Sequence, residues 1–266
     1  MSPSKKNTAL LSTRDAIFAA AARLFSSRGF DGVSMDDTAR EAGVNKAMIY
    51  YHFADKLALY RAIVSDGLQA MGDTAGAIAA SAATPHYKLD AFIEAFVRMT
   101  ELRPWMPAMM LREIAEGAPR LDPGTMQHMR GVIGSFVAIL KEGQALGTFR
   151  NLHPVLAYES VIGPIIINAA RERVAAQPDR QQQDFPLLVS ISHEDVIAHG
   201  QETARRMLAP EIQEPPKTDK PGPQKATNLY EMHHSRRRAL FSAVVDAAVR
   251  GASRVPWCNA GRIRQR

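Results

Sequence analysis

The sequence predicts an all-α protein, and three observations lead to this prediction. Apolar residues recur at helical spacing through most of the chain. Capping residues precede these apolar segments, and glycines or prolines follow them. We find neither an internal repeat nor a convincing alternation of apolar and polar residues, which would indicate a half-buried strand. We therefore expect roughly nine helices in the main body of the chain.

The composition is that of an ordinary globular protein, with 46% hydrophobic and 23% charged residues in 266. The only cysteine is Cys258, so neither a disulfide framework nor a thiolate metal cluster is expected. No apolar run approaches the roughly 20 residues that span a bilayer, and the N-terminus does not resemble a secretory signal. We expect a cytoplasmic protein without membrane insertion.

Charge is distributed unevenly along the chain. The net charge of +6 arises from +3 in residues 1–61, −5 in residues 62–216 and +8 in residues 217–266. Basic ends favour contact with polyanions, whereas an acidic middle does not. An uneven scatter of surface charge without function is the alternative explanation.

Residues 12–28 predict the first helix. Ser12 and Asp15 form a capping box at its start, and Gly29 is suited to end it. Its apolar residues follow the i, i+3, i+4, i+7, i+8 pattern that places them on one face. They are Ile17, Ala20, Ala21, Leu24 and Phe25.

A short helix, a turn and another short helix come next. Ser34 and Asp37 form a second capping box, which opens a helix through roughly Ala42. Gly43 permits a tight turn, and Asn45 is a good N-cap for a third helix. This order of elements predicts a helix-turn-helix. Helical hairpins are common in all-α proteins, so a purely structural hairpin remains the alternative.

Further helices are predicted by the same signals. Asp55 caps a fourth helix that continues to about residue 82. The remaining helices are expected at about residues 89–97, from residues 104–107 to 114, at 126–147, at 154–175 with a kink at Pro164, and from Ser192 or His193 to Leu208. Residues 177–192 have the composition of a loop.

The composition changes at residue 210. Residues 210–225 are rich in proline and lysine and predict an extended linker, and an apolar stripe behind three arginines at 236–238 predicts a short amphipathic helix. The basic tail could neutralise DNA phosphates, bind an anionic membrane or be an extension without a set role. We therefore predict three parts, residues 1–61, 62–210 and 211–266.

The stretch NKAMIYYHF at residues 45–53 decides between structural and functional interpretations of the hairpin. Aromatic and β-branched residues favour a strand, but the preceding turn and cap favour a helix. In a helix Ile49 and Phe53 share an inward face, whereas Lys46 and Tyr50 share another. A solvated helix rarely exposes so many aromatic rings without a purpose. A lysine beside phenol and imidazole groups suits contacts with phosphates and base edges.

These residues carry a resemblance to a known family. The first helix ends in LFSSRGF, the second helix and turn read SMDDTAREAGV, the third helix closes in YYHF, and DKLALY follows. As a set, over about residues 12–61, they resemble the N-terminal domain of TetR-type transcriptional regulators. The resemblance implies a homodimer that binds a palindromic operator under the control of a small ligand, with the fourth helix linking two domains. Beyond residue 61 only the all-helical layout is similar.

The resemblance also implies roles for individual residues. Lys46 and Ala47 would meet base edges, with Met48 nearby, whereas other side chains would contact the DNA backbone. This family often has YHYF where the chain has YYHF, which leaves the separate roles of Tyr51 and His52 open. The complete set of predicted DNA-binding residues is Ser34, Met35, Asn45, Lys46, Ala47, Met48, Tyr50, Tyr51, His52 and Lys56.

The second domain is expected to hold the effector. Methionine and aromatic side chains form adaptable apolar cavities, although such stripes more often fill a core. The candidate effector-binding residues are Phe92, Phe96, Trp105, Met106, Met109, Met110, Phe136 and Tyr158. Arg112 and Glu113 either orient the ligand or are solvated, and the acidic domain favours a neutral or cationic lipophilic molecule. The helices at 154–175 and 193–209 form the dimer surface in the family layout, or pack within one chain.

Other classes of protein find less support in the sequence. The histidines are dispersed, so no metal site is expected, and no cofactor motif is present. No nucleophile motif supports an enzyme. The leading hypothesis is a repressor that a small lipophilic ligand releases from its operator; an activator, or a regulator without a ligand, is a variant. The alternative from another class is a small-molecule carrier whose helical hairpin is structural.

Overall fold

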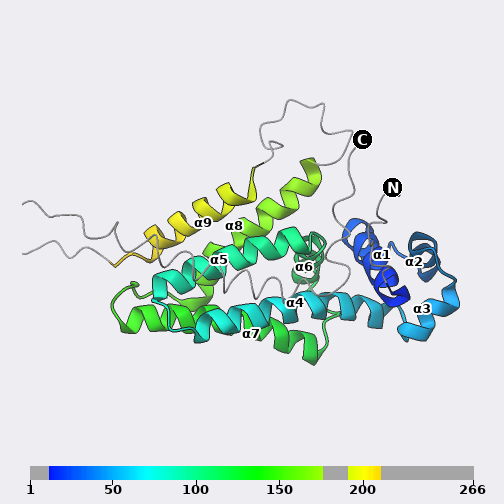
Figure 1. Ribbon diagram of the computed structural model, residues 1–266, viewed down its shortest axis with the longest axis horizontal. Coiled ribbons are helices and arrows are strands. Elements are labelled where there is room, and N and C mark those ends of the chain that lie inside the picture. The colour runs from blue at the N-terminus through cyan, green and yellow to red at the C-terminus, as the bar shows by residue number, and fades with distance from the viewer. Residues whose placement is uncertain (1–11, 176–190, 211–266) are drawn as a thin grey trace, which may run out of the picture.

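The computed structural model describes residues 12–175 and 191–210, and all regular structure in these residues is helical (Figure 1). This confirms the predicted all-α class. The helices are α1 (Thr13–Arg28), α2 (Met35–Ala42), α3 (Lys46–His52), α4 (Lys56–Ala80), α5 (Pro85–Leu102), α6 (Met106–Ala115), α7 (Pro123–Ala145), α8 (Pro154–Ala175) and α9 (His193–Leu208).

The helices form two groups along the long axis of the molecule. In Figure 1, α1, α2 and α3 lie together at one end, and the long helix α4 runs from them into the second group. There α4 packs along α7, and α5 packs against α4, α7, α8 and α9. Helix α6 lies where the groups meet and contacts both α1 and α8. One continuous helix therefore belongs to both groups.

Local capping sets the helix starts at the N-terminal end. Ser12 accepts the N–H of Asp15, and Ser34 and Asp37 form a complete capping box. Asn45 accepts the N–H of Met48 at the start of α3. These contacts confirm the predicted caps, each of which contributes about 1 kcal/mol to helix stability.

The turn between α2 and α3 depends on a glycine. Gly43 has φ 68° and ψ 31°, the left-handed conformation that a side chain disfavours. Its N–H donates to the carbonyls of Ala39 and Arg40, and the N–H of Val44 donates to Ala39 at 3.0 Å. These bonds close α2 and aim the chain into α3.

Two hydrophobic cores share α4. The N-terminal core combines buried residues of α1, α2 and α3 with Leu59 to Leu68 of α4 and with Met106 and Met109 of α6. The C-terminal core begins at Met71 of α4 and includes buried residues of α5, α7, α8 and α9. The boundary between the cores therefore falls within α4, and α6 contributes to the N-terminal core although it follows α5 in the chain.

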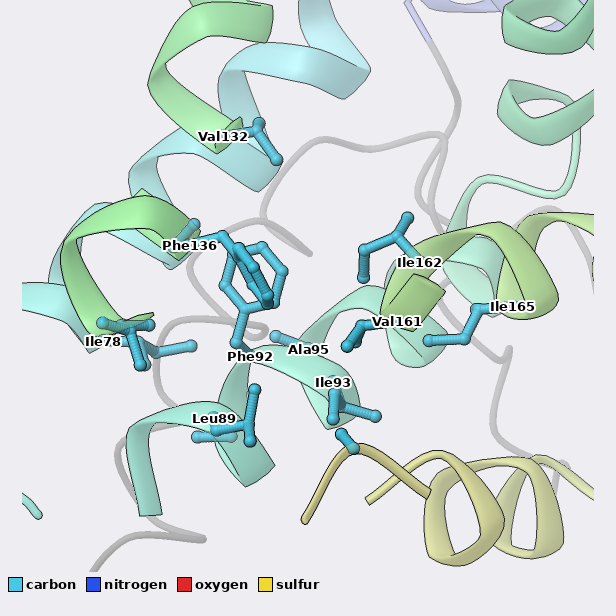
Figure 2. Packing of buried hydrophobic residues seen from close by; sticks show 14 of the residues in the cluster. Ile78, Leu89, Phe92, Ile93, Ala95, Val132, Phe136, Val161, Ile162 and Ile165 are labelled. Carbon is cyan, nitrogen blue, oxygen red and sulfur yellow. The ribbon is translucent and has the colours of Figure 1, made fainter. Parts of the chain in front are cut away.

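The C-terminal core is centred on two phenylalanines. Figure 2 shows the rings of Phe92 and Phe136 against each other between α5 and α7, with centroids 5.5 Å apart. Aliphatic side chains from four helices surround them, including Ile78, Leu89, Val132 and Ile162 (Figure 2). Both rings are completely buried.

The remaining predicted segments differ in their outcome. Helix α8 continues through Pro164 as one helix from Pro154 to Ala175, and α9 begins after the N-cap Ser192, as predicted. Most of the predicted loop at 177–192 lies outside the described residues. The predicted linker and tail, residues 211–266 with Cys258, also lie outside them.

No helix in residues 12–175 or 191–210 combines the length and the apolar character that crossing a bilayer requires.

Candidate nucleic-acid interface

Helix α3 is anchored by its inner face. Ile49 is fully buried and Phe53 nearly so, and both belong to the N-terminal core. This confirms the predicted inward face of NKAMIYYHF and excludes a strand, because residues 46–52 are helical. The anchoring leaves the opposite face of α3 to solvent.

The outer face of α3 carries the predicted DNA-binding side chains. Asn45, Lys46 and Ala47 are exposed, and Met48 and His52 are partly exposed. Tyr50 and Tyr51 expose 49% and 81% of their surface, and Tyr51 is the most exposed large hydrophobic residue among the described residues. The structure therefore brings these predicted residues together on one short helix at the end of the molecule (Figure 1).

Tyr51 and His52 form a pair at the C-terminal end of α3. Their rings make an edge-to-face contact with centroids 5.0 Å apart. The contact orients two side chains whose separate roles the sequence leaves open.

Lys46 is held by an acidic residue of α2. Its Nζ donates to Asp36 Oδ2 at 2.8 Å, and this hydrogen bond raises the pKa of Lys46. Both side chains are exposed, so the ion pair itself adds little to stability. The pair instead links the two helices of the hairpin at their outer surface and determines where the ammonium group lies.

The side chains of Ser34 and Met35 make contacts within the N-terminal group of helices. The Ser34 hydroxyl donates to Asp37 at 2.6 Å and accepts the Asp37 N–H, and these contacts lower the pKa of Asp37. Met35 is 7% exposed and packs in the N-terminal core. A DNA contact by Met35 therefore stays a prediction, and it would use the backbone N–H of Met35 in the first turn of α2, since the apolar face of α2 buries the side chain.

Lys56 contacts other residues of the N-terminal group of helices. Its Nζ donates to the carbonyl of Val33 at 2.9 Å and lies 4.2 Å from the centre of the Phe30 ring. These contacts hold the turn before α2 against the start of α4. A phosphate could meet the remaining donors of the ammonium group, since lysine has three.

One further cation lies beside this surface. Arg14 is exposed near the start of α1, and its guanidinium lies 5.2 Å from the centre of the Phe53 ring. It therefore stands next to the C-terminal end of α3, although the two residues are far apart in sequence. The sequence interpretation did not consider Arg14, because it followed only the contiguous hairpin and no local pattern links Arg14 to Phe53.

An apolar cavity lies where the two cores meet. Its volume is about 180 Å³. Its walls belong to five helices: Gly67, Leu68 and Met71 of α4, Phe96, Met99 and Thr100 of α5, Met106, Pro107, Met110 and Ile114 of α6, Met129, Val132 and Ile133 of α7, and Tyr158 and Ile166 of α8.

The cavity contains half of the predicted effector-binding residues. Phe96, Met106, Met110 and Tyr158 line it. Phe92, Met109 and Phe136 are buried in the two cores away from it, and Trp105 lies beside the N-terminal core. Helical spacing identifies buried positions, but it does not show which of them face a void.

Arg112 and Glu113 do not line the cavity; Glu113 is buried rather than solvated, and Arg112 is partly exposed. Glu113 is fully buried and accepts hydrogen bonds from the hydroxyl of Tyr60 at 2.8 Å and from Arg120 at 2.9 Å. Arg112 donates to the carbonyls of Phe25 and Ser26 in the last turn of α1. Both residues therefore attach α6 to the N-terminal group.

Aromatic rings complete this attachment. Phe25, Phe30 and Tyr60 form a cluster with edge-to-face and stacked contacts, and Arg120 lies 5.0 Å from the centre of Phe30. Burial, followed by the hydrogen bond to Glu113, raises the pKa of Tyr60 well above its ordinary value. The Tyr60 hydroxyl therefore stays protonated and donates to the carboxylate at all physiological pH values.

Helices α8 and α9 carry apolar surface. Val155, Leu156 and Ile167 of α8 are exposed, and a groove of about 270 Å³ lies between α8 and α9. This is the region that the sequence predicts to form a dimer contact.

Among the described residues, no group of three histidine, cysteine or acidic side chains lies close enough to hold a metal ion.

Together the fold and the surface define a class. A short helix with an exposed polar and aromatic face, set by a left-handed glycine turn against a buried hairpin partner, is the arrangement of a helix-turn-helix DNA-binding protein. An all-helical second group with an apolar cavity follows it.

Comparison with known proteins relates the N-terminal group to a known family. Residues 17–63 match the family described as bacterial regulatory proteins, tetR family, so the N-terminal group is a TetR-type domain. Over 47 residues the chain is 43% identical to IcaR of Staphylococcus aureus strain Newman, a negative transcriptional regulator of a biofilm operon. That match covers 18% of this chain and 25% of IcaR, so the chain spans a quarter of the length of the curated relatives it matches first.

Solved structures extend the similarity to the fold as a whole. PfmR of Thermus thermophilus, a TetR family transcriptional regulator, is 25% identical with a TM-score of 0.56, over 71% of this chain and 97% of PfmR. The ketosteroid transcriptional regulator KstR2 of Mycobacterium tuberculosis has a TM-score of 0.61 at 19% identity, over 75% of this chain and 96% of KstR2. The N-terminal domain is thus of TetR type, and the fold of the chain is similar to that of solved TetR-type regulators, as the sequence predicts.

Proposed function

We propose that the protein is a transcriptional repressor that binds operator DNA through the outer face of α3. The observation that carries this proposal is the exposure of Lys46, Tyr50 and Tyr51 on a helix whose inner face is buried. Binding DNA would remove the two aromatic rings from water, and a base edge or phosphate would take the place of Asp36 beside Lys46.

The proposed assembly is a homodimer on a palindrome. The exposed apolar residues of α8, with α9 beside them, would pair with the same surface of a second copy in a two-fold contact. The dimer would place two α3 helices in successive major grooves, about 34 Å apart. Such a protein would act in the cytoplasm.

The proposed signal is a small lipophilic molecule in the cavity between the two cores. One side of α6 lines that cavity through Met106, Met110 and Ile114. The same helix is attached to α1 through Arg112 and to α4 through Glu113. A ligand that moves α6 would therefore move the N-terminal group, change the separation of the two α3 helices and release the operator.

Footprinting tests this function. The purified full-length chain should protect a palindromic segment in the DNA that flanks its own gene, at moderate salt. Absence of protection at every protein concentration would refute the proposal and favour a carrier protein with a structural hairpin. Protection that no lipophilic molecule relieves would leave a DNA-binding regulator without the proposed signal.

Lys46→Ala should reduce the discrimination between operator and random DNA by about 1–3 kcal/mol, because Lys46 is proposed to read a base. The measurement is the ratio of the two dissociation constants at one salt concentration. Lys141→Ala is the matched control, since Lys141 is exposed on α7, remote from α3, and its loss should leave the ratio unchanged. Equal weakening on all sequences would show that Lys46 contacts a phosphate instead.

Asp36→Asn should increase affinity for random DNA by up to about fivefold, because it removes a negative charge from the proposed interface and frees the Lys46 ammonium. Affinity for the operator should rise less, so specificity falls. Both constants can be obtained by fluorescence anisotropy. A drop in random-DNA affinity would show that Asp36 holds Lys46 in its binding position rather than competing with DNA for it.

A further inference from the structure

We infer that the cavity between the two cores binds a neutral molecule, about the size of a substituted benzene ring, that presents one hydrogen-bond acceptor to the hydroxyl of Tyr158. The inference rests on the proposed function, whose signal it narrows to one chemical class. The absence of charged side chains from the wall, the cavity volume and the two hydroxyl-bearing residues of the wall support it.

The cavity wall excludes charged ligands. Among the described residues, no lysine, arginine, histidine, aspartate or glutamate lines it. The ion pair between Arg103 and Asp66, at 3.1 Å, is close by, because Arg103 also contacts Met99 and Asp66 precedes Gly67. The two charges pair with one another, and neither residue belongs to the cavity wall. A carboxylate or an ammonium group would thus lose its hydration without gaining a partner.

The volume limits the size of the ligand. About 180 Å³ is slightly more than the roughly 150 Å³ of an engineered apolar cavity that binds benzene. Five of the chain's 12 methionines line the wall: Met71, Met99, Met106, Met110 and Met129. Thioether side chains are unbranched and adapt to irregular shapes, so a ring with a short substituent can be accommodated.

Tyr158 supplies the hydrogen-bond donor. Its hydroxyl has no hydrogen-bond partner among residues 12–175 and 191–210, and burial raises its pKa to about 12, so it is neutral and carries its proton. Its ring packs edge-to-face on Phe136 with centroids 5.5 Å apart, which fixes its direction. Thr100 is the other hydroxyl of the wall, but it donates to the carbonyl of Val97 at 2.7 Å. The hydroxyl of Tyr158 is therefore the donor left for a ligand.

Three probes with the same number of non-hydrogen atoms distinguish the effect of a hydrogen-bond acceptor from the effect of a charge. Cumene is apolar, acetophenone adds a carbonyl acceptor, and benzoate adds a negative charge. The full-length protein, labelled at its methionine methyl groups, is titrated with each probe at neutral pH and followed by NMR. Cumene and acetophenone should shift the methyl signals of the five methionines in the wall. Benzoate should bind at least about 100-fold more weakly than acetophenone, because an ion would be buried without a partner.

Tyr158→Phe supplies the matched variant, because it removes only the hydroxyl. It should weaken acetophenone binding by about 3–10-fold, the value of one neutral hydrogen bond, and leave cumene binding unchanged. Benzoate that binds as tightly as acetophenone would overturn the inference, as would shifts confined to the other methionines or equal acetophenone affinity in the variant.

Operator binding without any probe is measured separately. If the protein protects its operator but the cavity binds none of the probes, the inference fails and the proposed DNA binding stands. If the probes bind as expected and no DNA is protected, the proposed function fails while the ligand class is supported.

Discussion

Glu113→Ala is expected to lower the free energy of unfolding by about 3 kcal/mol, at the lower end of the cost of breaking a buried ion pair. The substitution removes the acceptor for the Tyr60 hydroxyl and for one Nη of Arg120, both of which lie inside the protein. Arg120 keeps Glu116 at 2.6 Å, which limits the loss. The measurement is urea unfolding of the full-length chain.

Glu116→Ala is the matched control for this experiment. Glu116 pairs with the same guanidinium but is exposed, so its removal should cost less than about 1 kcal/mol. Equal effects of the two substitutions would contradict the burial of Glu113. Tyr60→Phe should lower the free energy of unfolding by an intermediate amount, about 1–2 kcal/mol, since it leaves the carboxylate paired with Arg120.

Gly143→Ala is expected to destabilise the protein by about 3 kcal/mol, the upper part of the range for overpacking a core. An added Cβ would overlap the ring of Phe149, which is buried against the C-terminal end of α7. The ring cannot move away, because the N–H groups of Thr148 and Phe149 both donate to the Gly143 carbonyl, at 2.8 and 3.0 Å. Thermal or urea unfolding measures the effect.

Gly134→Ala on the same helix should instead stabilise the protein. No atom lies within 4 Å of the Cβ that would be added there. Alanine in the interior of a helix is about 0.5–1 kcal/mol more favourable than glycine. If both substitutions changed stability equally, the close approach of Phe149 to α7 would not be the cause.

What could be predicted from the sequence depended on the separation of the interacting residues. The caps at Ser12, Ser34 and Asn45 join residues three apart, so the local pattern already contains both partners. The class and the inward face of α3 followed from helical spacing for the same reason. The local pattern therefore sufficed for the helices and for the orientation of the hairpin.

The contacts that attach α6 could not be predicted in this way. Tyr60 and Glu113 are 53 residues apart, and Arg112 reaches a carbonyl 87 residues earlier. A charged pair on a short helix is compatible with solvent, a ligand or a distant backbone, and spacing does not distinguish these. The same holds for Met35, whose burial depends on how α2 packs on its neighbours.

The passage of α4 through both cores has a consequence for exchanging parts between proteins. A fragment ending at residue 61 would lack Ile63, Val64 and Leu68, together with Met106 and Met109 of α6, which fill the N-terminal core. The smallest transplantable N-terminal module therefore extends through α6. A chimaera that is to keep the N-terminal core intact would have to inherit α4 and α6 from the same parent as α1, and place its junction beyond Ala115.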